Sequence, residues 1–387
     1  MTTSLAAPAL MDTYRRSPVT FVRGRGCTLF DVEGNAYLDM VAGLAVVSVG
    51  HCHPAVTAAI ATQCEQLVHV SNLYSTEPGA VLAERLSSLT GGMHSFLCNS
   101  GAEAVECALK LARKHGGERR TVVAADGGFH GRTLGALSVT GQPAKQAPFE
   151  PLVGGIRHVP FGDASALEAG LGPDVAGVLL EPIQGEAGVV VPPEGYLARV
   201  RQLCDRSGAL LMLDEVQTGL GRTGEWFAYQ HDGVVPDVVC LAKGLAAGLP
   251  IGACLARPEV AASLVPGDHG STFGGGPVPT AAAVAVLDVI EKEGLVGRAR
   301  EAGKRLRGGL GRVFPDAQVR GRGLLAGVVF PAKVAREVAE SALRLGLLVN
   351  EVAPDVLRLC PPLVVTDAEI DRALEILEEV RDEIGTT

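Results

Sequence analysis

The sequence has no uninterrupted apolar run that approaches the roughly 18 residues of a membrane-spanning helix. Its first residues, MTTSLAAPALMDTYRR, have no basic segment followed by an apolar segment, which is the pattern of a secretory signal. It also has no run of lysines or arginines, and its formal net charge of -9 argues against a nucleic-acid surface. We therefore expect a cytoplasmic globular protein that binds neither a membrane nor nucleic acid.

Paired cysteines are absent as well. The nine cysteines are scattered singly, and no C-x-x-C pair occurs. Most of them are expected to be small buried hydrophobes in a reducing compartment. The stretch GHCHP places His51, Cys52 and His53 together, but no second ligand cluster follows at the spacing of a zinc site. We therefore expect a turn before a helix at GHCHP, and no metal site.

The middle of the chain, from about residue 55 to 260, alternates short apolar runs with longer amphipathic segments. The runs include TVVAAD, GVLLEPI, ALLMLDEV, DVVCLA and IGACLA. Runs that are apolar throughout are typical of strands buried on both faces, hence of a mostly parallel sheet covered by helices. Between them lie helical stretches such as GAEAVECALKLARKHG, with Val105, Ala108, Leu109 and Ala112 at helical spacing. The pattern predicts an α/β fold.

Both ends of the chain have a different pattern. The first 50 residues resemble a short β-meander that turns at Glu33 to Asn35. After Pro277 an alanine-rich helix, TAAAVAVLDVIEKEGL, leads into further short strands and a charged final helix. We expect residues 1–50 and 277–387 to form a small α+β domain from both chain ends, and residues 51–276 to form the large domain.

One segment suggests a nucleotide cofactor at first sight. LLMLDEVQTGLGRTG places Gly219, Gly221 and Gly224 at the G-x-G-x-x-G spacing of a dinucleotide-binding turn. The following stretch, EWFAYQHDGVVPD, is too short and broken to be the long helix whose N-terminus holds a pyrophosphate. We interpret the spacing as coincidental, which makes a dinucleotide-dependent oxidoreductase the weaker hypothesis.

The acidic residue before these glycines is more informative. Asp214 follows one apolar run, and Lys243 follows the next, VVCLA. Ligands of open parallel sheets lie at the carboxyl ends of strands, so these two side chains are candidates for one site. Alone, Asp214 is typical of a turn or helix cap and Lys243 of a surface charge. Together they match pyridoxal phosphate, which needs a lysine for a Schiff base and a carboxylate to keep the pyridine nitrogen protonated.

A phosphate site and a ring contact are also present in the sequence. In CNSGAEAVECALK, Ser100 is a candidate N-cap, and Gly101 and Ala102 offer unobstructed N–H groups at the positive end of a helix dipole. In GGFHGRT, Phe129 is a candidate to cover the cofactor ring. Arg132 is a candidate fork for a substrate carboxylate.

With these residues the chain resembles the class III, fold-type I pyridoxal-phosphate aminotransferases, and within them the acetylornithine aminotransferases of arginine biosynthesis. The resemblance runs nearly end to end. It rests on the ordered motifs MDTYRR, GHCHP, HVSNLYSTEP, CNSGAEA, FHGRTLGALSVTGQ, EPIQGEAGV, LDEVQTGLGRTG, LAKG, HGSTFGG and LRLCPPL. It implies a large domain built on a mostly parallel seven-stranded sheet.

The resemblance also implies a set of cofactor contacts. Lys243 is the Schiff-base lysine, Asp214 pairs with the pyridine nitrogen, and Gln217 lies near the 3'-oxygen of the ring. The full implied set is Ser100, Gly101, Ala102, Phe129, His130, Asp214, Glu215, Val216, Gln217, Lys243 and Thr272. Thr272 is implied to reach the phosphate in a partner subunit, so the resemblance predicts a homodimer.

The implied substrate contacts fit a ping-pong reaction between N2-acetylornithine and 2-oxoglutarate. Arg132 binds the carboxylate far from the reacting amine, Arg358 grips the α-carboxylate of glutamate, and Glu186 pairs with Arg358 when that carboxylate is absent. The full implied set is Arg132, Ser271, Arg358, Glu186, Tyr14 and Asn72. Lys243 is also the implied proton carrier, which requires its neutral form.

A few positions depart from the family pattern. Ala246 and Ala247 in KGLAAG, and Gly276 in STFGGGP, differ from the KGLGGG and STFGGNP that are common in the family. All three are small residues near the site, and we expect tuned loops with activity kept. Leu44 falls near a tyrosine of ornithine aminotransferases, and its apolar side chain favours a substrate whose α-amino group is acylated. The alternatives are another class III ω-aminotransferase, for ornithine, succinylornithine, acetyllysine or 4-aminobutyrate, an aminomutase, and a dimeric binding protein without activity.

Overall fold

The computed structural model describes residues 9–385, and its centre is a seven-stranded sheet. The strands are β4 (His94–Cys98), β5 (Thr121–Ala125), β6 (Ile156–Val159), β7 (Val175–Leu180), β8 (Leu210–Asp214), β9 (Val238–Leu241) and β10 (Gly252–Ala256). Their order is β4-β10-β9-β8-β7-β5-β6. The strands from β5 to β9 are parallel to one another, and β10 runs antiparallel to both of its neighbours. The predicted α/β fold with a mostly parallel sheet of seven strands is confirmed.

Both faces of this sheet are buried, as the continuous apolar runs predict. Every residue of β7 and β8 is buried. In β8, Leu211 and Leu213 belong to one core cluster, and Met212 belongs to another that includes Val105 and Ala108 of α4 (Gly101–His115). Alternate side chains of one strand therefore pack into two separate cores, because successive side chains of a strand point to opposite faces.

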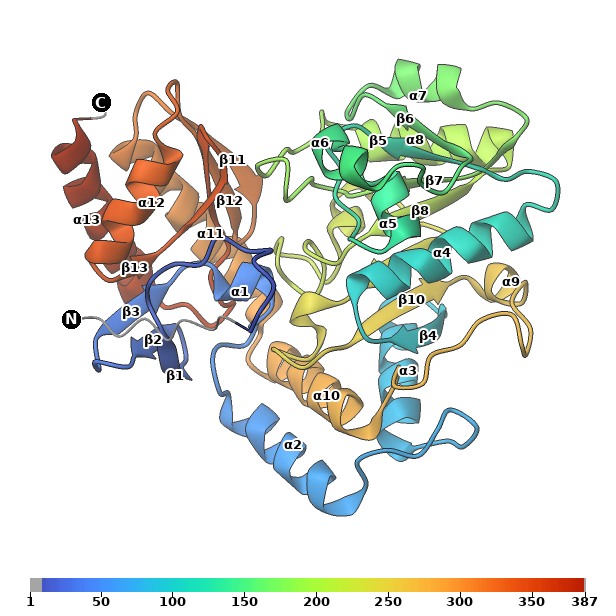
Figure 1. The fold of residues 1–387 in the computed structure, drawn as a ribbon, viewed down its shortest axis with the longest axis horizontal. Coiled ribbons are helices and arrows are strands. Elements are labelled where there is room, and N and C mark those ends of the chain that lie inside the picture. Colours follow the sequence, from blue (N-terminus) through green and yellow to red (C-terminus); the bar gives the residue numbers. More distant parts are fainter. Residues whose placement is uncertain (1–8, 386–387) are drawn as a thin grey trace.

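The two ends of the chain meet in smaller sheets. One has the order β1-β2-β3-β13, with β1 (Phe21–Arg25), β2 (Thr28–Asp31), β3 (Ala36–Asp39) and β13 (Leu347–Leu348). The other has the order β11-β12-β15-β14, with β11 (Gln318–Arg322), β12 (Leu325–Val329), β14 (Asn350–Ala353) and β15 (Val356–Leu359). Figure 1 shows these blue and orange segments side by side, and β13 pairs with β3 in parallel. The exact domain boundaries stay predictions.

Helices surround these sheets. They are α1 (Ala42–Ala45), α2 (Pro54–Gln66), α3 (Glu77–Leu89), α5 (Leu134–Val139), α6 (Pro143–Gln146), α7 (Ala164–Gly170), α8 (Tyr196–Ser207), α9 (Pro258–Ala261), α10 (Pro277–Lys292), α11 (Leu295–Val313), α12 (Ala335–Arg344) and α13 (Asp367–Ile384). The 3-10 turns are η1 (Ala147–Phe149), η2 (Ala228–Asp232) and η3 (Lys243–Leu245). Within residues 9–385, no helix has both the length and the apolar character needed to cross a membrane.

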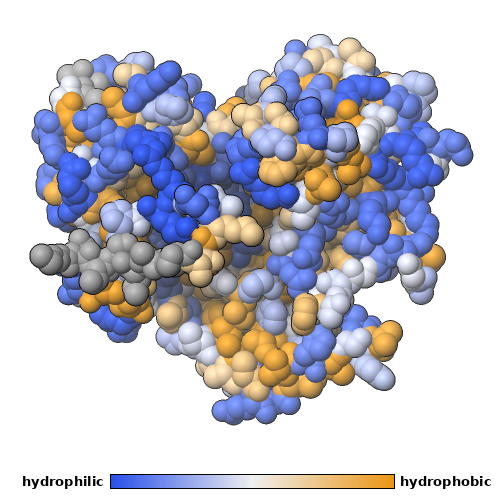
Figure 2. All heavy atoms as spheres, viewed as in Figure 1, coloured by the Kyte–Doolittle hydropathy of each residue, from blue (hydrophilic) through white to orange (hydrophobic). Residues whose placement is uncertain are grey.

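The surface is unevenly apolar. Figure 2 shows hydrophobic residues gathered over the lower part of the molecule, where Figure 1 places α2 and α10. Large side chains in the loop after α2 are strongly exposed, with exposed fractions of 61% for Val68, 86% for Leu73 and 69% for Tyr74. Exposed apolar side chains that lie close together mark an interaction surface more often than isolated ones do.

Candidate active site

A cavity of about 320 Å³ lies at the carboxyl ends of the central strands. It is lined by the start of α4, the turn after β5, the ends of β7 and β8, and η3, which follows β9. The register of the sheet explains why Asp214 and Lys243 meet there. Asp214 pairs with Cys240 of the neighbouring parallel strand, three residues before Lys243. Because the two strands are adjacent and parallel, both side chains lie at the same end of the sheet, the carboxyl ends of its strands, where ligands of such sheets bind.

One end of the cavity has the features of an anion site. Ser100 caps α4, and its hydroxyl accepts a hydrogen bond from the Glu103 N–H at 3.2 Å. A side chain at Gly101 would be crowded, since a Cβ atom there would lie 3.0 Å from the Val216 side chain. Ser100, Gly101 and Ala102 all line the cavity. Free backbone N–H groups and the positive end of the helix dipole make this end suitable for a phosphate.

Asp214 is buried and is held from two sides. Its Oδ2 lies 2.8 Å from His130 Nδ1, and its Oδ1 accepts a hydrogen bond from the Val216 N–H at 3.1 Å. Burial lowers the pKa of His130, but the hydrogen bond to Asp214 and its charge outweigh this effect and raise the pKa above its ordinary value. Among residues 9–385 the buried His130 Nε2 has no hydrogen-bond partner. The pair fixes a buried negative charge at the cavity wall.

Lys243 stands in an unusual backbone conformation. Its φ is +42°, in the left-handed region that a non-glycine residue rarely adopts, and such residues concentrate at functional sites. The neighbouring backbone is fixed, because Ser48 Oγ donates a hydrogen bond to the Gly244 carbonyl at 2.9 Å. Burial lowers the pKa of Lys243, and the charge of Arg358 acts in the same direction, whereas Glu186 and Asp214 oppose it. The result is an amine that is more readily neutral and nucleophilic.

Glu181, at the end of β7, is a site residue that the sequence interpretation missed. Its carboxyl oxygens accept hydrogen bonds from the backbone N–H groups of Phe129 and Gly185, each at 2.9 Å. It thereby joins the turn that carries Phe129 to the loop that carries Glu186. Burial raises the pKa of Glu181 to about 7, with His130 opposing the shift and Asp214 adding to it. The signal was its place directly after a buried strand.

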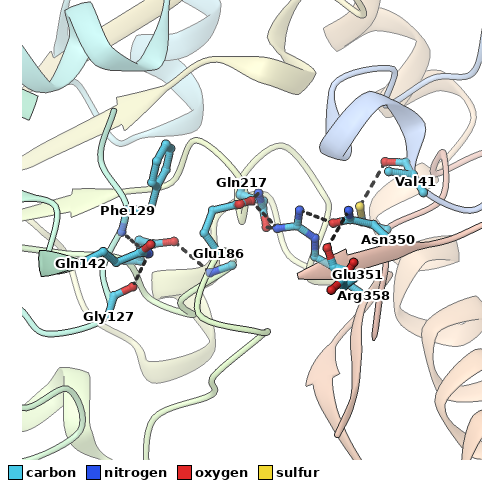
Figure 3. Close-up of polar contacts among 12 residues, drawn as sticks. Val41, Gly127, Phe129, Gln142, Glu186, Gln217, Asn350, Glu351 and Arg358 are labelled. Carbon is cyan, nitrogen blue, oxygen red and sulfur yellow. Dashed lines mark hydrogen bonds and ion pairs between the residues drawn. The ribbon is translucent and has the colours of Figure 1, made fainter. Parts of the chain in front are cut away.

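Arg358, on β15, is the centre of a second group of polar side chains that bond to one another. Its side chain is 1% exposed, and its Nη1 donates to Glu186 Oε1 at 2.5 Å and to Gln217 Oε1 at 3.1 Å. Its Nη2 donates to Asn350 Oδ1 at 2.7 Å. Figure 3 shows Glu186 between this group and the turn of Phe129. Burial raises the pKa of Glu186, but the charge and hydrogen bond of Arg358 outweigh it and lower that pKa. Asn350 carried no recognisable sequence signal.

Other predicted residues lie elsewhere. Ser271 and Thr272 line a second cavity of about 440 Å³, and Asn72 organises it by donating to the carbonyls of Ser271 and Gly274, each at 2.9 Å. Arg132 is exposed beside the Phe129 ring, with its guanidinium carbon 5.6 Å from the ring centroid.

Two further predicted residues do not line the main cavity. Tyr14 is 72% exposed and lies beside Arg16. Glu215 points into the core, where it accepts hydrogen bonds from the Tyr229 N–H at 2.9 Å and from the Thr218 hydroxyl. Their assigned contacts with substrate and cofactor stay predictions.

The glycines after Gln217 do not form a nucleotide-binding turn. Gly221 and Gly224 lie against Val296 and Arg300 of α11, where side chains would be crowded. The next element is the short η2, and α11, the helix that these two glycines contact, starts about 70 residues later in the chain. The interpretation of this spacing as coincidental agrees with the fold.

The cavity fits pyridoxal phosphate on several independent features. It has a helix N-terminus for a phosphate, a buried carboxylate for a ring nitrogen, an aromatic side chain for the ring face and a largely buried amine. The buried His130 Nε2, which lacks a partner within the described residues, leaves donor or acceptor capacity for a bound group.

The comparisons agree with this arrangement. The family described as Aminotransferase class-III matches residues 11–380, and the chain belongs to this family. It is a transferase that uses pyridoxal 5'-phosphate. Among curated proteins it is 52% identical to an acetylornithine aminotransferase of Mycolicibacterium smegmatis over 96% of each chain. It is 51% identical to that of Streptomyces coelicolor, over 98% of this chain and 94% of the relative.

Solved structures give the same picture. An ornithine aminotransferase from Toxoplasma gondii superposes with a TM-score of 0.94 at 36% identity, covering 98% of this chain and 93% of that one. An acetylornithine aminotransferase from Elizabethkingia anophelis superposes with a TM-score of 0.86 at 33% identity, covering 96% of each. The predicted fold type is therefore confirmed.

Proposed function

We propose that this enzyme transfers the amino group of N2-acetyl-L-ornithine to 2-oxoglutarate, giving N-acetyl-L-glutamate 5-semialdehyde and L-glutamate, in arginine biosynthesis. The full-length similarity to acetylornithine aminotransferases supports the assignment. The observation that carries it is the buried ion pair of Arg358 with Glu186. Such a pair allows one site to take an amine substrate without an α-carboxylate and then an α-amino acid. We also propose that the enzyme acts in the cytoplasm.

The residues of the cavity have separate roles in this reaction. Pyridoxal phosphate, when bound, supplies an electron sink for the carbon that loses its proton. Ser100, Gly101 and Ala102 would hold its phosphate and Asp214 its ring nitrogen, with His130 keeping the Asp214 carboxylate in place. Lys243 Nζ would attach the cofactor covalently and, once displaced by the substrate amine, carry the proton from the reacting carbon.

The movable ion pair serves the two half-reactions in turn. The reacting end of acetylornithine carries no carboxylate, so Glu186 stays on Arg358 and keeps its buried charge neutralised. The α-carboxylate of glutamate takes the place of Glu186, and the fork of Arg358 then binds it in a bidentate manner. Asn350, already bonded to Nη2, keeps the guanidinium oriented in both states.

The exposed Arg132 beside Phe129 favours an acylated substrate. If Arg132 binds the carboxylate of ornithine, the adjacent α-ammonium group lies next to that cation and is repelled. Acetylation removes this positive charge. The apolar Leu44, 39% exposed in this chain, has no polar group that would compensate a free ammonium.

We expect kcat/KM for N2-acetylornithine to exceed that for free ornithine by about 100-fold or more, since like-charge contacts cost several kcal/mol. Steady-state kinetics with 2-oxoglutarate as acceptor measure this ratio. Succinylornithine, acetyllysine and 4-aminobutyrate complete the panel. A preference for free ornithine or for 4-aminobutyrate would replace the assignment by another class III aminotransferase.

We also propose that the enzyme works as a homodimer. The second cavity, with Ser271 and Thr272, opens beside the exposed Leu73, Tyr74 and Phe273, which form an apolar surface. In a dimer this surface is covered, and the segment around Thr272 reaches the phosphate end of the partner's site. Sedimentation equilibrium is expected to give twice the chain mass of 40.0 kDa, and a fully active monomer would contradict this assembly.

A further inference from the structure

Arg132 and Lys145 are two cations beside one aromatic ring. The guanidinium carbon of Arg132 and the ammonium nitrogen of Lys145 each lie 5.6 Å from the centroid of the Phe129 ring. Within residues 9–385 no carboxylate forms an ion pair with either side chain, and the only hydrogen-bond partner of the ammonium is the amide of Gln142. Because Phe129 lines the main cavity with Lys243, both charges lie at the edge of the active site.

Lys145 is held in this position by the turn that carries Phe129. The Gln142 side chain donates from Nε2 to the Gly127 carbonyl at 2.9 Å and accepts from the Lys145 ammonium through Oε1. The backbone N–H of Lys145 also donates to the backbone carbonyl of Gln142 at 2.9 Å, at the start of α6. Figure 3 shows Gln142 and Gly127 together below Phe129. The half-buried lysine is therefore a tethered cation, unlike a freely moving surface lysine.

The charges around this pair favour an incoming anion. Burial lowers the pKa of Lys145, and the positive charge of Arg132 lowers it further, while Glu186 acts in the opposite direction. Glu186 itself is committed to Arg358. Two neighbouring cations without a carboxylate repel each other, and a carboxylate bound between them relieves this repulsion and gains two charge-assisted hydrogen bonds.

We propose that Lys145 completes, with Arg132, a two-cation subsite for the substrate carboxylate far from the reacting amine. In acetylornithine this group is the α-carboxylate, and in glutamate and 2-oxoglutarate it is the side-chain carboxylate. Lys145 is thus a specificity residue that both half-reactions share, whereas Arg358 serves only one. The inference rests on the proposed function for the identity of the substrates, and on the geometry around Phe129 for the subsite.

Calorimetric titration of the holoenzyme with glutarate tests the subsite without turnover, because glutarate has the two carboxylates of 2-oxoglutarate and no reactive carbonyl. Lys145→Met is expected to lower the affinity for glutarate about five- to ten-fold, because the variant loses one charge-assisted contact that is partly open to solvent. Lys145→Arg is expected to restore the affinity, and Lys304→Met, at an exposed position of α11, is expected to leave it unchanged. Equal glutarate affinity in Lys145→Met and the unaltered enzyme would overturn the proposal.

The pH dependence of glutarate binding provides a readout that a merely structural role does not produce. Carboxylate binding needs the protonated ammonium of Lys145. The affinity of the unaltered enzyme is therefore expected to fall as the pH rises through the lowered pKa of Lys145, below the ordinary value of 10.5. Lys145→Arg, which stays charged, is expected to lose this pH dependence. If the variant kept it, Lys145 would not be the responsible group.

A substrate without the carboxylate separates the subsite from the general integrity of the enzyme. N-acetyl-1,4-diaminobutane is acetylornithine that lacks its carboxylate. Lys145→Met is expected to raise the KM for acetylornithine five- to ten-fold more than that for this amine. Equal losses for both amines contradict the subsite. If the unaltered enzyme turned over neither amine, the proposed function would fail, while the glutarate titration would still decide the subsite.

Discussion

Lys243→Ala is expected to lower kcat by at least about 10⁴-fold in both half-reactions. Two contributions disappear together, namely the covalent attachment of the cofactor and the proton transfer at the reacting carbon, and proton transfer alone is worth about 10²- to 10⁴-fold. Lys243 lies in η3, two residues after the end of β9, and its backbone is in the left-handed region. Stopped-flow measurement of each half-reaction checks the prediction.

Covalent attachment has a direct readout of its own. Borohydride reduction fixes the cofactor to the unaltered enzyme and adds its mass to the chain, and Lys243→Ala is expected to show no added mass. The proposed contacts at Ser100, Phe129 and Asp214 are expected to bind the cofactor non-covalently in this variant, and visible absorption measures this binding. Lys304→Ala is the matched control, since its ammonium lies on the exposed face of α11. A stable borohydride label on the Lys243→Ala chain would refute the assignment.

The fold could be predicted from the sequence because its pattern is local. Continuous apolar runs at β7 and β8 indicate strands covered on both faces, and the structure buries every residue of both. The placement of Asp214 and Lys243 in one cavity was also predictable, because each stands at the end of such a run. Their proximity required only that the two strands be neighbours, which the register between Asp214 and Cys240 confirms.

The remaining site features depend on contacts between distant segments, which no local pattern carries. Asn350 orients Arg358 across a strand pair, and Glu181 joins two loops through backbone hydrogen bonds. Lys145 has the sequence context of an ordinary surface lysine, and only the tether through Gln142 places it beside Phe129. The position of the Glu215 side chain could not be predicted from the position of Asp214, the preceding residue. Successive residues after a strand point in different directions, and Glu215 points into the core.

Arg358→Ala is expected to separate the two half-reactions. The step with glutamate or 2-oxoglutarate should slow by about 10²- to 10³-fold, because a buried, hydrogen-bonded charge pair with the α-carboxylate is worth a few kcal/mol. The step with acetylornithine should slow less than about ten-fold, because this substrate has no carboxylate to place there. Since the guanidinium is 1% exposed, Arg358→Lys is a second variant that keeps the charge but loses the bidentate fork.

Glu186→Gln is the matched control because it alters the other partner of the same ion pair. It leaves Arg358 free for the α-carboxylate of glutamate, so that half-reaction should be kept, while acetylornithine meets a buried cation without its counter-ion and reacts more slowly. The two variants therefore shift substrate preference in opposite directions. Single-turnover rates with each substrate measure these opposite shifts in preference. Equal losses of rate for both substrates in Arg358→Lys would show that Arg358 supports the fold and does not select the substrate. The opposite shifts would follow only if one guanidinium exchanges an internal carboxylate for that of the substrate.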